Sequence, residues 1–303
     1  MSGFVDIQVN GYAGVDFNSD GLTDEQFVAV CEQLRRDGVR SLLPTVITDR
    51  LEAMASRIER IAMAAEQIPQ VAEMVAGIHV EGPFISPVTG YVGAHPVDCV
   101  CDATDSAAMR LIDAGRGRVR LLTLAPEAPG AIEVTRRLAD EGILVAGGHS
   151  DASRDQLQQA IDAGMSLFTH LGNGCPPQMH RHDNIVQRVL SVSERLTISF
   201  IADGHHVPWF ALGNYLRLVP DDRIVIVTDA ITAAGLGPGE YRLGGQTVYV
   251  DEDLAAWGAE RKQFAGCATT MPQMVQLLQS ELGIDDARIE RWTQHNPAAL
   301  FQI

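Results

Sequence analysis

The sequence predicts a (β/α)8 barrel of the TIM type with a β-hairpin insertion after the eighth strand. Three observations support this fold: the chain has 303 residues, a usual length for such a barrel; short apolar runs alternate with amphipathic segments; and eight such runs occur. Continuous apolar strands separated by helical segments indicate a parallel sheet whose outer face is covered. The runs are Phe4–Val9, Ser41–Ile47, Val75–Val80, Val119–Leu124, Ile143–Ala146, Ser166–Thr169, Leu196–Ile201 and Arg223–Thr228.

Capping sequences mark the helices between these runs. Thr23 and Gln26 form the pattern of a capping box, with Gly38 at the end of that helix, and Ser153 and Gln156 repeat the pattern. An open, doubly wound sheet is the alternative fold, but no GxGxxG sequence follows the first run, and eight regularly alternating runs favour closure. Further helices are expected near residues 50–66, 129–141, 208–217, 268–282 and 286–293.

The segment 238–265 departs from the alternation. It follows the eighth run and contains Tyr-Arg-Leu-Gly-Gly-Gln-Thr-Val-Tyr-Val, in which Gly244 and Gly245 predict the turn of a β-hairpin. No low-complexity linker or repeat divides the chain. Residues 1–303 are therefore expected to form one domain, with this hairpin as an insertion.

Composition limits the class of protein. Hydrophobic residues make up 46% of the chain and charged residues 20%, which is typical of a globular protein with a large core. The net charge of −16 argues against binding to nucleic acid or an anionic membrane. No apolar stretch is long enough to span a membrane and no signal peptide is recognisable, so a cytoplasmic protein is expected. The five cysteines form no CxxC pair and are expected to be reduced thiols.

Strongly polar residues follow four of the apolar runs. Glu81 follows the third run, His149 the fifth, His170 the sixth and Asp229 the eighth. In a (β/α)8 barrel the carboxyl ends of the strands converge on one mouth, which carries the catalytic groups. Two histidines and a glutamate leave the fourth position of a zinc ion open. A single histidine after a strand is more often structural, so the argument depends on all four residues together.

Seven short motifs occur in order along the chain: Asp6-Ile-Gln-Val-Asn-Gly, His79-Val-Glu-Gly-Pro-Phe, Gly-Ala-His95-Pro, Gly-Gly-His149-Ser, Thr-His170-Leu, Ala-Asp203-Gly-His-His206-Val and Val-Thr-Asp229-Ala. As an ordered series they resemble the motifs of N-acetylglucosamine-6-phosphate deacetylases in the amidohydrolase superfamily, although each motif alone is weak. The likeness runs from about residue 3 to the terminal Asn296-Pro-Ala-Ala-Leu.

The resemblance implies a reaction and roles for these residues. The reaction is hydrolytic removal of the N-acetyl group from an amino sugar, with N-acetylglucosamine 6-phosphate as the expected substrate. Asp229 is the implied catalytic acid and base, and one divalent ion, expected to be zinc, is the implied cofactor. The implied metal ligands are Glu81, His149 and His170. The implied substrate contacts are His95 and His206.

Departures from the family pattern concern the metal and the domains. Many superfamily members carry an HxH pair after strand one that supports a second metal, whereas this chain has Gln8 and Asn10. Neutral amides are poor zinc ligands, so one metal is expected. The fourth run has no lysine for a carbamylated bridge, since the single lysine, Lys262, lies in the insertion. The small β-sandwich of the family is expected to be missing, and apolar surface left uncovered predicts self-association, a homodimer being the simplest form.

The loop after His170 differs most from the family. The family generally has Leu-Phe-Asn-Ala-Met and then an Arg-Glu-Pro-Gly loop that helps bind phosphate. This chain has Leu-Gly-Asn-Gly-Cys-Pro-Pro-Gln-Met-His-Arg-His-Asp-Asn over residues 171–184. Asn173 and Gly174 are expected to contact substrate, and Arg181 is the candidate phosphate ligand. An unphosphorylated N-acetyl sugar, an N-acyl amino acid, or a catalytically silent sugar-binding barrel are the alternatives.

The remaining histidines have structural interpretations. His180 and His182 are either substrate contacts or solvent-facing loop residues. His205 is expected to be a structural neighbour of the substrate-binding position beside it. His79 is expected to fill the barrel interior through hydrogen bonds, and His295 to cap a helix or lie at the surface.

Overall fold

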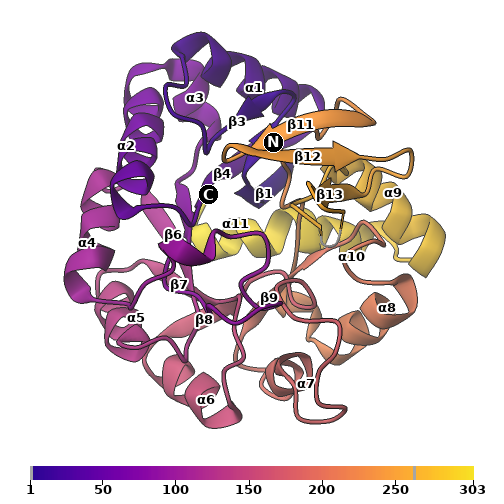
Figure 1. The fold of residues 1–303 in the computed structure, drawn as a ribbon. Coiled ribbons are helices and arrows are strands. Elements are labelled where there is room, and N and C mark those ends of the chain that lie inside the picture. The colour runs from indigo at the N-terminus through magenta and orange to yellow at the C-terminus, as the bar shows by residue number, and fades with distance from the viewer. Residues whose placement is uncertain (1–2, 262–263) are drawn as a thin grey trace.

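The computed structural model describes residues 3–261 and 264–303, and in these residues eight parallel strands form a nearly closed barrel (Figure 1). The strands follow one another around the barrel in chain order, and each neighbouring pair is parallel. The predicted (β/α)8 fold is therefore confirmed. The barrel strands are β1 (Phe4–Val9), β4 (Val39–Ile47), β5 (Ile78–Glu81), β6 (Val119–Leu124), β7 (Leu144–Gly147), β8 (Met165–Phe168), β9 (Thr197–Ile201) and β10 (Ile224–Val227).

Helices surround the barrel between consecutive strands. Leu34 and Ile58, from the first two helices, lie in one buried apolar cluster with Leu42 of β4. Both predicted capping boxes are present, at Thr23 and Ser153. The helices are α1 (Asp24–Arg36), α2 (Leu51–Gln67), α3 (Pro69–Met74), α4 (Asp105–Ala114), α5 (Ala131–Asp140), α6 (Arg154–Asp162), α7 (Ile185–Leu190), α8 (Trp209–Leu218), α9 (Met271–Leu282), α10 (Asp286–Glu290) and α11 (Asn296–Phe301), with 3-10 turns η1 (Val97–Cys99) and η2 (Asp221–Arg223) and a π-helical turn η3 (Arg291–His295).

Some elements differ from the sequence prediction. The third strand begins at Ile78 instead of Val75, because Val75 ends the unpredicted helix α3 and makes only an isolated bridge to Leu42. Helices α4, α7 and α11 were also missed. None of the helices in the described ranges is long and apolar enough to cross a membrane. All five cysteines are free thiols, as expected.

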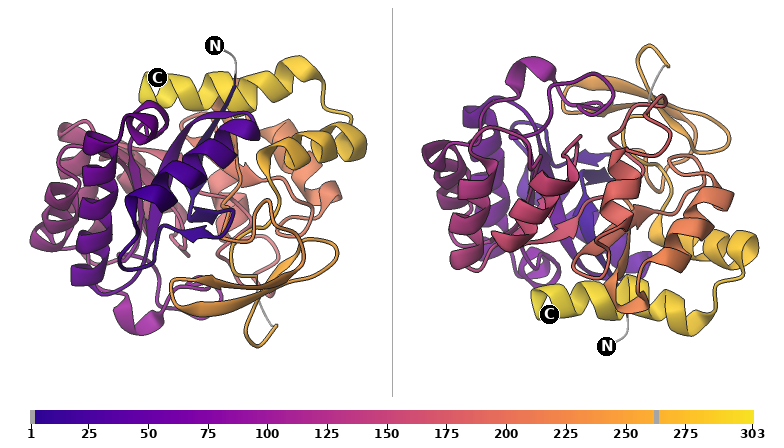
Figure 2. Two further views of the ribbon diagram at one scale, coloured as in Figure 1. Left: turned by 90° about the horizontal axis from the view of Figure 1, so that it is seen from above. Right: turned by 90° about the horizontal axis from the view of Figure 1, so that it is seen from below.

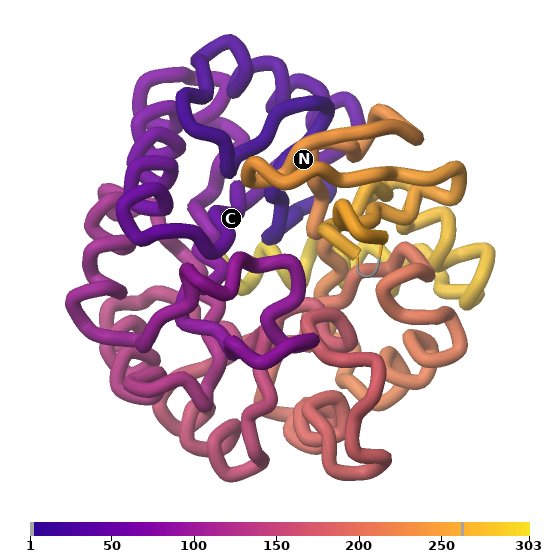
Figure 3. Tube along the Cα trace, in the orientation of Figure 1, coloured from indigo at the N-terminus to yellow at the C-terminus, as the bar shows by residue number. Residues whose placement is uncertain are grey.

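The two ends of the barrel are covered by different elements. The continuous C-terminal segment from α10 through α11 lies across one end, where η3 and α11 contact β1 and β10 (Figure 2). An antiparallel sheet of β11 (Gly239–Leu243), β12 (Gln246–Val250) and β13 (Ala256–Gly258) lies at the other end (Figure 2). Gly244 and Gly245 join its first two strands. Figure 3 shows this segment beside the N-terminal part of the chain, where β2 (Gly11–Tyr12) pairs with β3 (Val15–Asp16). Gly244 N–H donates to Asp16 Oδ2 of β3 at 2.8 Å.

The barrel closes between β1 and β10 with the help of a side chain. In the described part of the chain the backbone pairing there is an isolated bridge between Val9 and Ala230. The Asp6 carboxylate adds to it, accepting from Thr228 Oγ1 at 2.5 Å and from Thr228 N–H at 3.3 Å. We call this closing edge the β1–β10 seam. The absence of a small β-sandwich stays a prediction.

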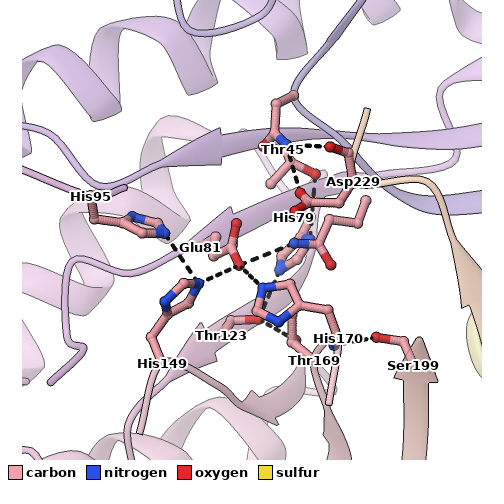
Figure 4. A network of polar contacts seen from close by, with 12 residues as sticks. Thr45, His79, Glu81, His95, Thr123, His149, Thr169, His170, Ser199 and Asp229 are labelled. Carbon is pink, nitrogen blue, oxygen red and sulfur yellow. Dashed lines mark hydrogen bonds and ion pairs between the residues drawn. The ribbon is translucent and has the colours of Figure 1, made fainter. Parts of the chain in front are cut away.

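Polar side chains fill the barrel interior below the mouth. His79 Nε2 lies 2.8 Å from Thr123 Oγ1, and His79 Nδ1 lies 3.2 Å from the Ile7 carbonyl oxygen. Thr123 also bonds Thr169 at 2.9 Å (Figure 4). Burial lowers the pKa of His79 to about 4. The predicted structural role of His79 is confirmed.

Candidate functional site

The structure brings the four strand-end residues together at the carboxyl end of the barrel. Glu81 is the last residue of β5, and His149, His170 and Asp229 each lie two residues beyond the end of their strands. All four line one cavity of about 60 Å³ and are at most 6% exposed. Figure 4 shows the side chains of Glu81, His149 and His170 converging.

Three of these residues have a left-handed backbone. The φ angles are +50° at His149, +32° at His170 and +50° at Asp229. A non-glycine residue in this region costs on the order of 1–3 kcal/mol, and such strain collects at functional sites where the surroundings impose it. The three strained residues thus favour the mouth as the candidate functional site, independently of any motif.

The spacing of the donor atoms fits a divalent cation. Glu81 Oε1 lies 2.9 Å from His170 Nε2 and 3.3 Å from His149 Nε2. Donor atoms that share one tetrahedral zinc ion are roughly 3.3 Å apart, given bonds of about 2.0–2.1 Å. His149 Nδ1 bonds the Tyr91 carbonyl oxygen at 2.9 Å, which leaves Nε2 free to coordinate. Burial raises the pKa of Glu81, but hydrogen bonds from both histidines outweigh it and hold that pKa well below its ordinary value.

His95 lies closer to this centre than the sequence suggested. Its Nε2 is 3.2 Å from His149 Nε2, and the two rings meet edge to face with centroids 4.4 Å apart. Within the described residues, Glu81, His95 and His149 have ligand atoms that all lie within 4.8 Å of one another. Burial, helped by the neighbouring His149, lowers the pKa of His95 to about 3, so its imidazole is neutral. The geometry therefore offers four donor side chains: Glu81, His95, His149 and His170. The Nε2 atoms of His149 and His170 both lie next to the same oxygen, Glu81 Oε1.

Two amides, Gln8 on β1 and Asn10 directly after it, bind carboxylates. Gln8 Nε2 donates to Glu81 Oε1 at 3.0 Å, and Asn10 Nδ2 donates to Asp229 Oδ1 at 2.7 Å. Gln8 and Asn10 are two positions apart, so their side chains share one face of the strand. Burial, with the nearby charge of Glu81, raises the pKa of Asp229 to about 6. The residues in the place of an HxH pair thus orient the two acidic groups.

A larger cavity adjoins the first. Its volume is about 540 Å³, and it shares Gly93, Asn173 and Phe264 with the smaller cavity. Much of its wall is apolar, and the rings of Trp257 and Phe264 pack with centroids 4.5 Å apart. Gly174 also lines it. The Trp257 side of this wall comes from β13, so the three-stranded sheet forms part of the mouth.

The predicted phosphate ligand lies away from both cavities. Arg181 is exposed and lines neither of them, and among the described residues neither lining includes an arginine or a lysine. Lys262 lies outside the described residues. His180 and His182 are exposed, and His180 Nδ1 accepts from Asp183 N–H at 2.9 Å. The geometry of this loop alone supplies no contact for a phosphate.

The other histidines agree with the structural interpretations. His205 Nε2 lies 2.8 Å from the Asp253 carbonyl oxygen, and His295 is an exposed residue 3.4 Å from Glu290.

His206, an expected substrate contact, lines the larger cavity, and its Nδ1 lies 2.7 Å from Asp203 Oδ2. Sequence reasoning assigned no role to Asp203. The signal was present, because Asp203 lies two residues beyond β9, as the other site residues do beyond their strands.

No protein-family model matches the chain. Its sequence is, however, similar to those of several curated deacetylases. It is 37% identical to the N-acetylglucosamine-6-phosphate deacetylase of Homo sapiens, over 99% of this chain and 74% of that protein. It is 30% identical to the enzyme of the same name from Lysinibacillus sphaericus, over 100% and 76%. It is also 34% identical to the N-acetylgalactosamine-6-phosphate deacetylase of Escherichia coli O157:H7, over 99% and 77%.

Solved structures give the same result. An N-acetyl-D-glucosamine-6-phosphate deacetylase mutant from Mycobacterium smegmatis, in complex with N-acetyl-D-glucosamine-6-phosphate, superposes with a TM-score of 0.90 at 30% identity, covering 100% of this chain and 77% of that one. The N-acetylglucosamine-6-phosphate deacetylase of Pasteurella multocida gives 0.88 at 30% identity, over 99% and 76%. The chain belongs to the N-acetylglucosamine-6-phosphate deacetylase family, a family of metal-dependent amidohydrolases.

Proposed function

We propose that this protein hydrolyses the amide bond of N-acetylglucosamine 6-phosphate, releasing acetate and glucosamine 6-phosphate. The observation that carries the proposal is the convergence of Glu81, His149 and His170 with the buried carboxylate of Asp229 on one cavity. A binding protein would need the cavity but not a carboxylate with a raised pKa beside a set of metal ligands. Residues 1–303 act as one unit in this proposal.

Glu81, His149 and His170 hold a single divalent ion, with zinc as the proposed metal. The two-histidine, one-carboxylate donor set suits zinc, and the engagement of Gln8 and Asn10 with carboxylates supports one ion instead of two. A bound divalent ion supplies Lewis-acid activation of the amide carbonyl and of water. His95 stands beside this set and either completes it or donates to the carbonyl oxygen of the substrate.

Asp229 is the proposed proton carrier. Its carboxylate accepts a proton from the attacking water as the carbon–oxygen bond forms. The same proton then goes to the amide nitrogen, which leaves as an amine when the carbon–nitrogen bond breaks. The hydrogen bond from Asn10 Nδ2 at 2.7 Å fixes one carboxylate oxygen, so the other is the one available to the water. A base whose pKa is raised toward neutrality holds and returns a proton more readily than an ordinary carboxylate.

The larger cavity is the proposed site of the sugar ring. Asn173 and His206 offer polar contacts, and the rings of Trp257 and Phe264 offer an apolar face against which the carbon–hydrogen bonds of a pyranose can pack. Arg181 stays the proposed phosphate ligand. Because it lines neither of these two cavities in the part of the chain that the structure describes, we propose that it acts across the interface of a homodimer, the assembly expected from the sequence.

Acetate release by the purified protein, measured together with its metal content, tests the proposal. The substrates are the 6-phosphates of N-acetylglucosamine and N-acetylgalactosamine, free N-acetylglucosamine and an N-acetyl amino acid, with Asp229→Asn as the inactive control. We expect the highest kcat/KM with N-acetylglucosamine 6-phosphate. The galactosamine epimer is the second candidate, since a relative from Escherichia coli O157:H7 at 34% identity bears that name. Equal acetate release by protein and Asp229→Asn would refute the proposal.

A further inference from the structure

Asp203 and His206 form a buried ion pair at the edge of the larger cavity. Both side chains are 2% exposed, and Asp203 Oδ2 lies 2.7 Å from His206 Nδ1. The second carboxylate oxygen, Oδ1, accepts the backbone N–H groups of His205 at 2.9 Å and His206 at 3.0 Å. The carboxylate is therefore held by the same short turn that carries the histidine, and the orientation of the imidazole relative to it is fixed.

The remaining ring nitrogen of His206 has no hydrogen-bond partner among the residues that the structure describes. His206 Nε2 is buried, and no hydrogen-bonding group among the described residues reaches it. The residue lines the cavity of about 540 Å³, with the Phe264 ring 5.0 Å away between centroids. A buried polar group without a hydrogen bond costs free energy, and such groups in native proteins are usually satisfied by a ligand or by water. Nε2 is thus poised for a group that enters the cavity.

The charges around His206 favour its protonated form. Burial lowers its pKa, but the adjacent carboxylate of Asp203 and the more distant Asp229 outweigh burial and raise that pKa above its ordinary value, against a smaller opposing effect of His170. The other titratable groups that line the cavity are Cys175 and Tyr215. Burial raises the pKa of both, so neither carries a negative charge near neutral pH.

We propose that Asp203 is a positioning residue that holds His206 as a doubly protonated imidazole, with its Nε2–H donated to an oxygen of the bound amino sugar. This imidazolium supplies the positive charge that the described lining of the cavity otherwise lacks. The inference rests on the proposed amino-sugar substrate for the identity of the acceptor, but the state of His206 in the free enzyme depends on its neighbouring carboxylates, above all Asp203, and needs no substrate. The buried hydrogen bond between the His206 imidazolium and the Asp203 carboxylate joins two charged groups, and such bonds are stronger than those between neutral groups.

Cys267 supplies a rival interpretation and also a control. Its Sγ lies 3.5 Å from Asp203 Oδ2. Asp203, His206 and Cys267 could together form a second metal site, since their ligand atoms all lie within 4.8 Å of one another. The 2.7 Å nitrogen–oxygen distance is instead that of a charged hydrogen bond, shorter than the roughly 3.3 Å between two ligands of one zinc. Burial also raises the pKa of Cys267 well above its ordinary value, so without a metal the group is a neutral thiol.

Three single variants and one double variant of the metal-loaded enzyme test the proposal. The single variants are Asp203→Asn, His206→Gln and the matched control Cys267→Ser, which alters a different neighbour of the same carboxylate. The double variant combines Asp203→Asn with His206→Gln. We expect Asp203→Asn to lower kcat/KM about 10- to 100-fold, the effect of losing a charged hydrogen bond, and to move the basic limb of the pH profile to lower pH. Cys267→Ser is expected to stay within about 3-fold of the native enzyme, with an unmoved profile. In the His206→Gln background, Asp203→Asn should add no further loss, because Asp203 acts through His206.

A measurement without substrate separates this inference from the proposed function. The 15N chemical shifts of the His206 ring in the free enzyme at pH 7 should report an imidazolium in the native protein and in Cys267→Ser, but a neutral ring in Asp203→Asn. A neutral ring in the native protein would overturn the proposal, as would additive losses in the double variant. Two metal ions per chain in the native protein, falling to one in Cys267→Ser, would overturn the proposal in favour of a second metal site at Asp203, His206 and Cys267. The substrate dependence of the loss in kcat/KM on Asp203→Asn identifies the acceptor. A larger loss with the phosphorylated sugar than with the unphosphorylated one supports the proposal with phosphate as the acceptor, and an equal loss supports it with a sugar hydroxyl.

Discussion

Replacing Gly174 by alanine should damage the proposed metal site through the packing of His149, one of its proposed ligands. The His149 ring lies between two glycines, and a Cβ built on Gly174 would come 2.9 Å from His149 Nδ1 and 3.1 Å from Cε1. On the other flank, a Cβ on Gly93 would come 3.1 Å from Cε1. The bond from Nδ1 to the Tyr91 carbonyl oxygen also fixes the ring, so moving the ring away from a new Cβ would strain that bond.

The size of the effect follows from two separate costs. Gly174 has a φ of +60°, and an alanine in that region costs roughly 1–2 kcal/mol of stability. The contact adds a displacement of His149 or of the 172–184 loop, and groups that orient a metal ligand typically contribute about 10- to 100-fold in metal affinity or activity. We therefore expect Gly174→Ala to lose about 1–2 kcal/mol in unfolding free energy and about 10- to 100-fold in zinc affinity.

Gly283→Ala is the matched control. Gly283 has a φ of +63° at the C-cap of α9, and no atom lies within 4 Å of a Cβ built there. It should show the same loss of stability with an unchanged metal affinity. Denaturant unfolding of the metal-free proteins gives the first quantity, and competition with a chromophoric chelator gives the second. Metal affinity in Gly174→Ala within 2-fold of the control, a limit set by the roughly 10-fold minimum expected, would refute the argument that the glycine spaces His149.

The other predictions concern charge. Asp229→Asn should keep fold and metal but lose nearly all turnover, because an amide cannot carry the proton; near-native acetate release would make Asp229 structural. Elemental analysis should give one tightly bound metal per chain, and two would contradict the interpretation of the β1 amides. Burial raises the pKa of Asp6 from 3.8 to about 7, so the native chain keeps a proton that the unfolded chain has lost, and stability should fall as pH rises between these values. Asp6→Asn should flatten that fall in denaturant midpoints measured from pH 4 to 8, whereas a parallel slope would exclude Asp6 as its source. Arg181→Ala should raise KM selectively for the phosphorylated sugar in a kinetic comparison with free N-acetylglucosamine, and equal changes for both would remove Arg181 from phosphate binding.

The placement of the site residues was predictable because of the geometry of parallel barrels. Their strands are short, buried and apolar, so the first polar residue after each run falls at the mouth. Glu81, His149 and His170 were found in this way. The same rule selects Asp203, two residues beyond β9, but its 2.7 Å bond to His206 Nδ1 depends on how the intervening turn folds, which no sequence pattern indicates.

Features that depend on irregular segments could not be predicted. His95 lies in the long connection between β5 and α4, which has no periodicity to indicate its path, so its 3.2 Å approach to His149 was not foreseen. The aromatic wall has a similar origin. Trp257 and Phe264 join across an isolated bridge that no turn signal announces. The sandwiching of the His149 ring by two glycines depends on two loops from different strands, and only the folded chain reveals it.

The β1–β10 seam has a consequence for how activity reports folding. Asn10 directly follows β1 and Asp229 lies just beyond β10, so the hydrogen bond between them crosses the seam. An intermediate with the other strand pairs formed but the seam open would keep nearly all of its helices and strands. Its Asp229, the proposed general base, would have no amide to orient it. Recovery of enzymatic activity during refolding should therefore lag behind recovery of far-ultraviolet ellipticity. In this enzyme, pairing the first and last barrel strands also completes the proposed catalytic centre.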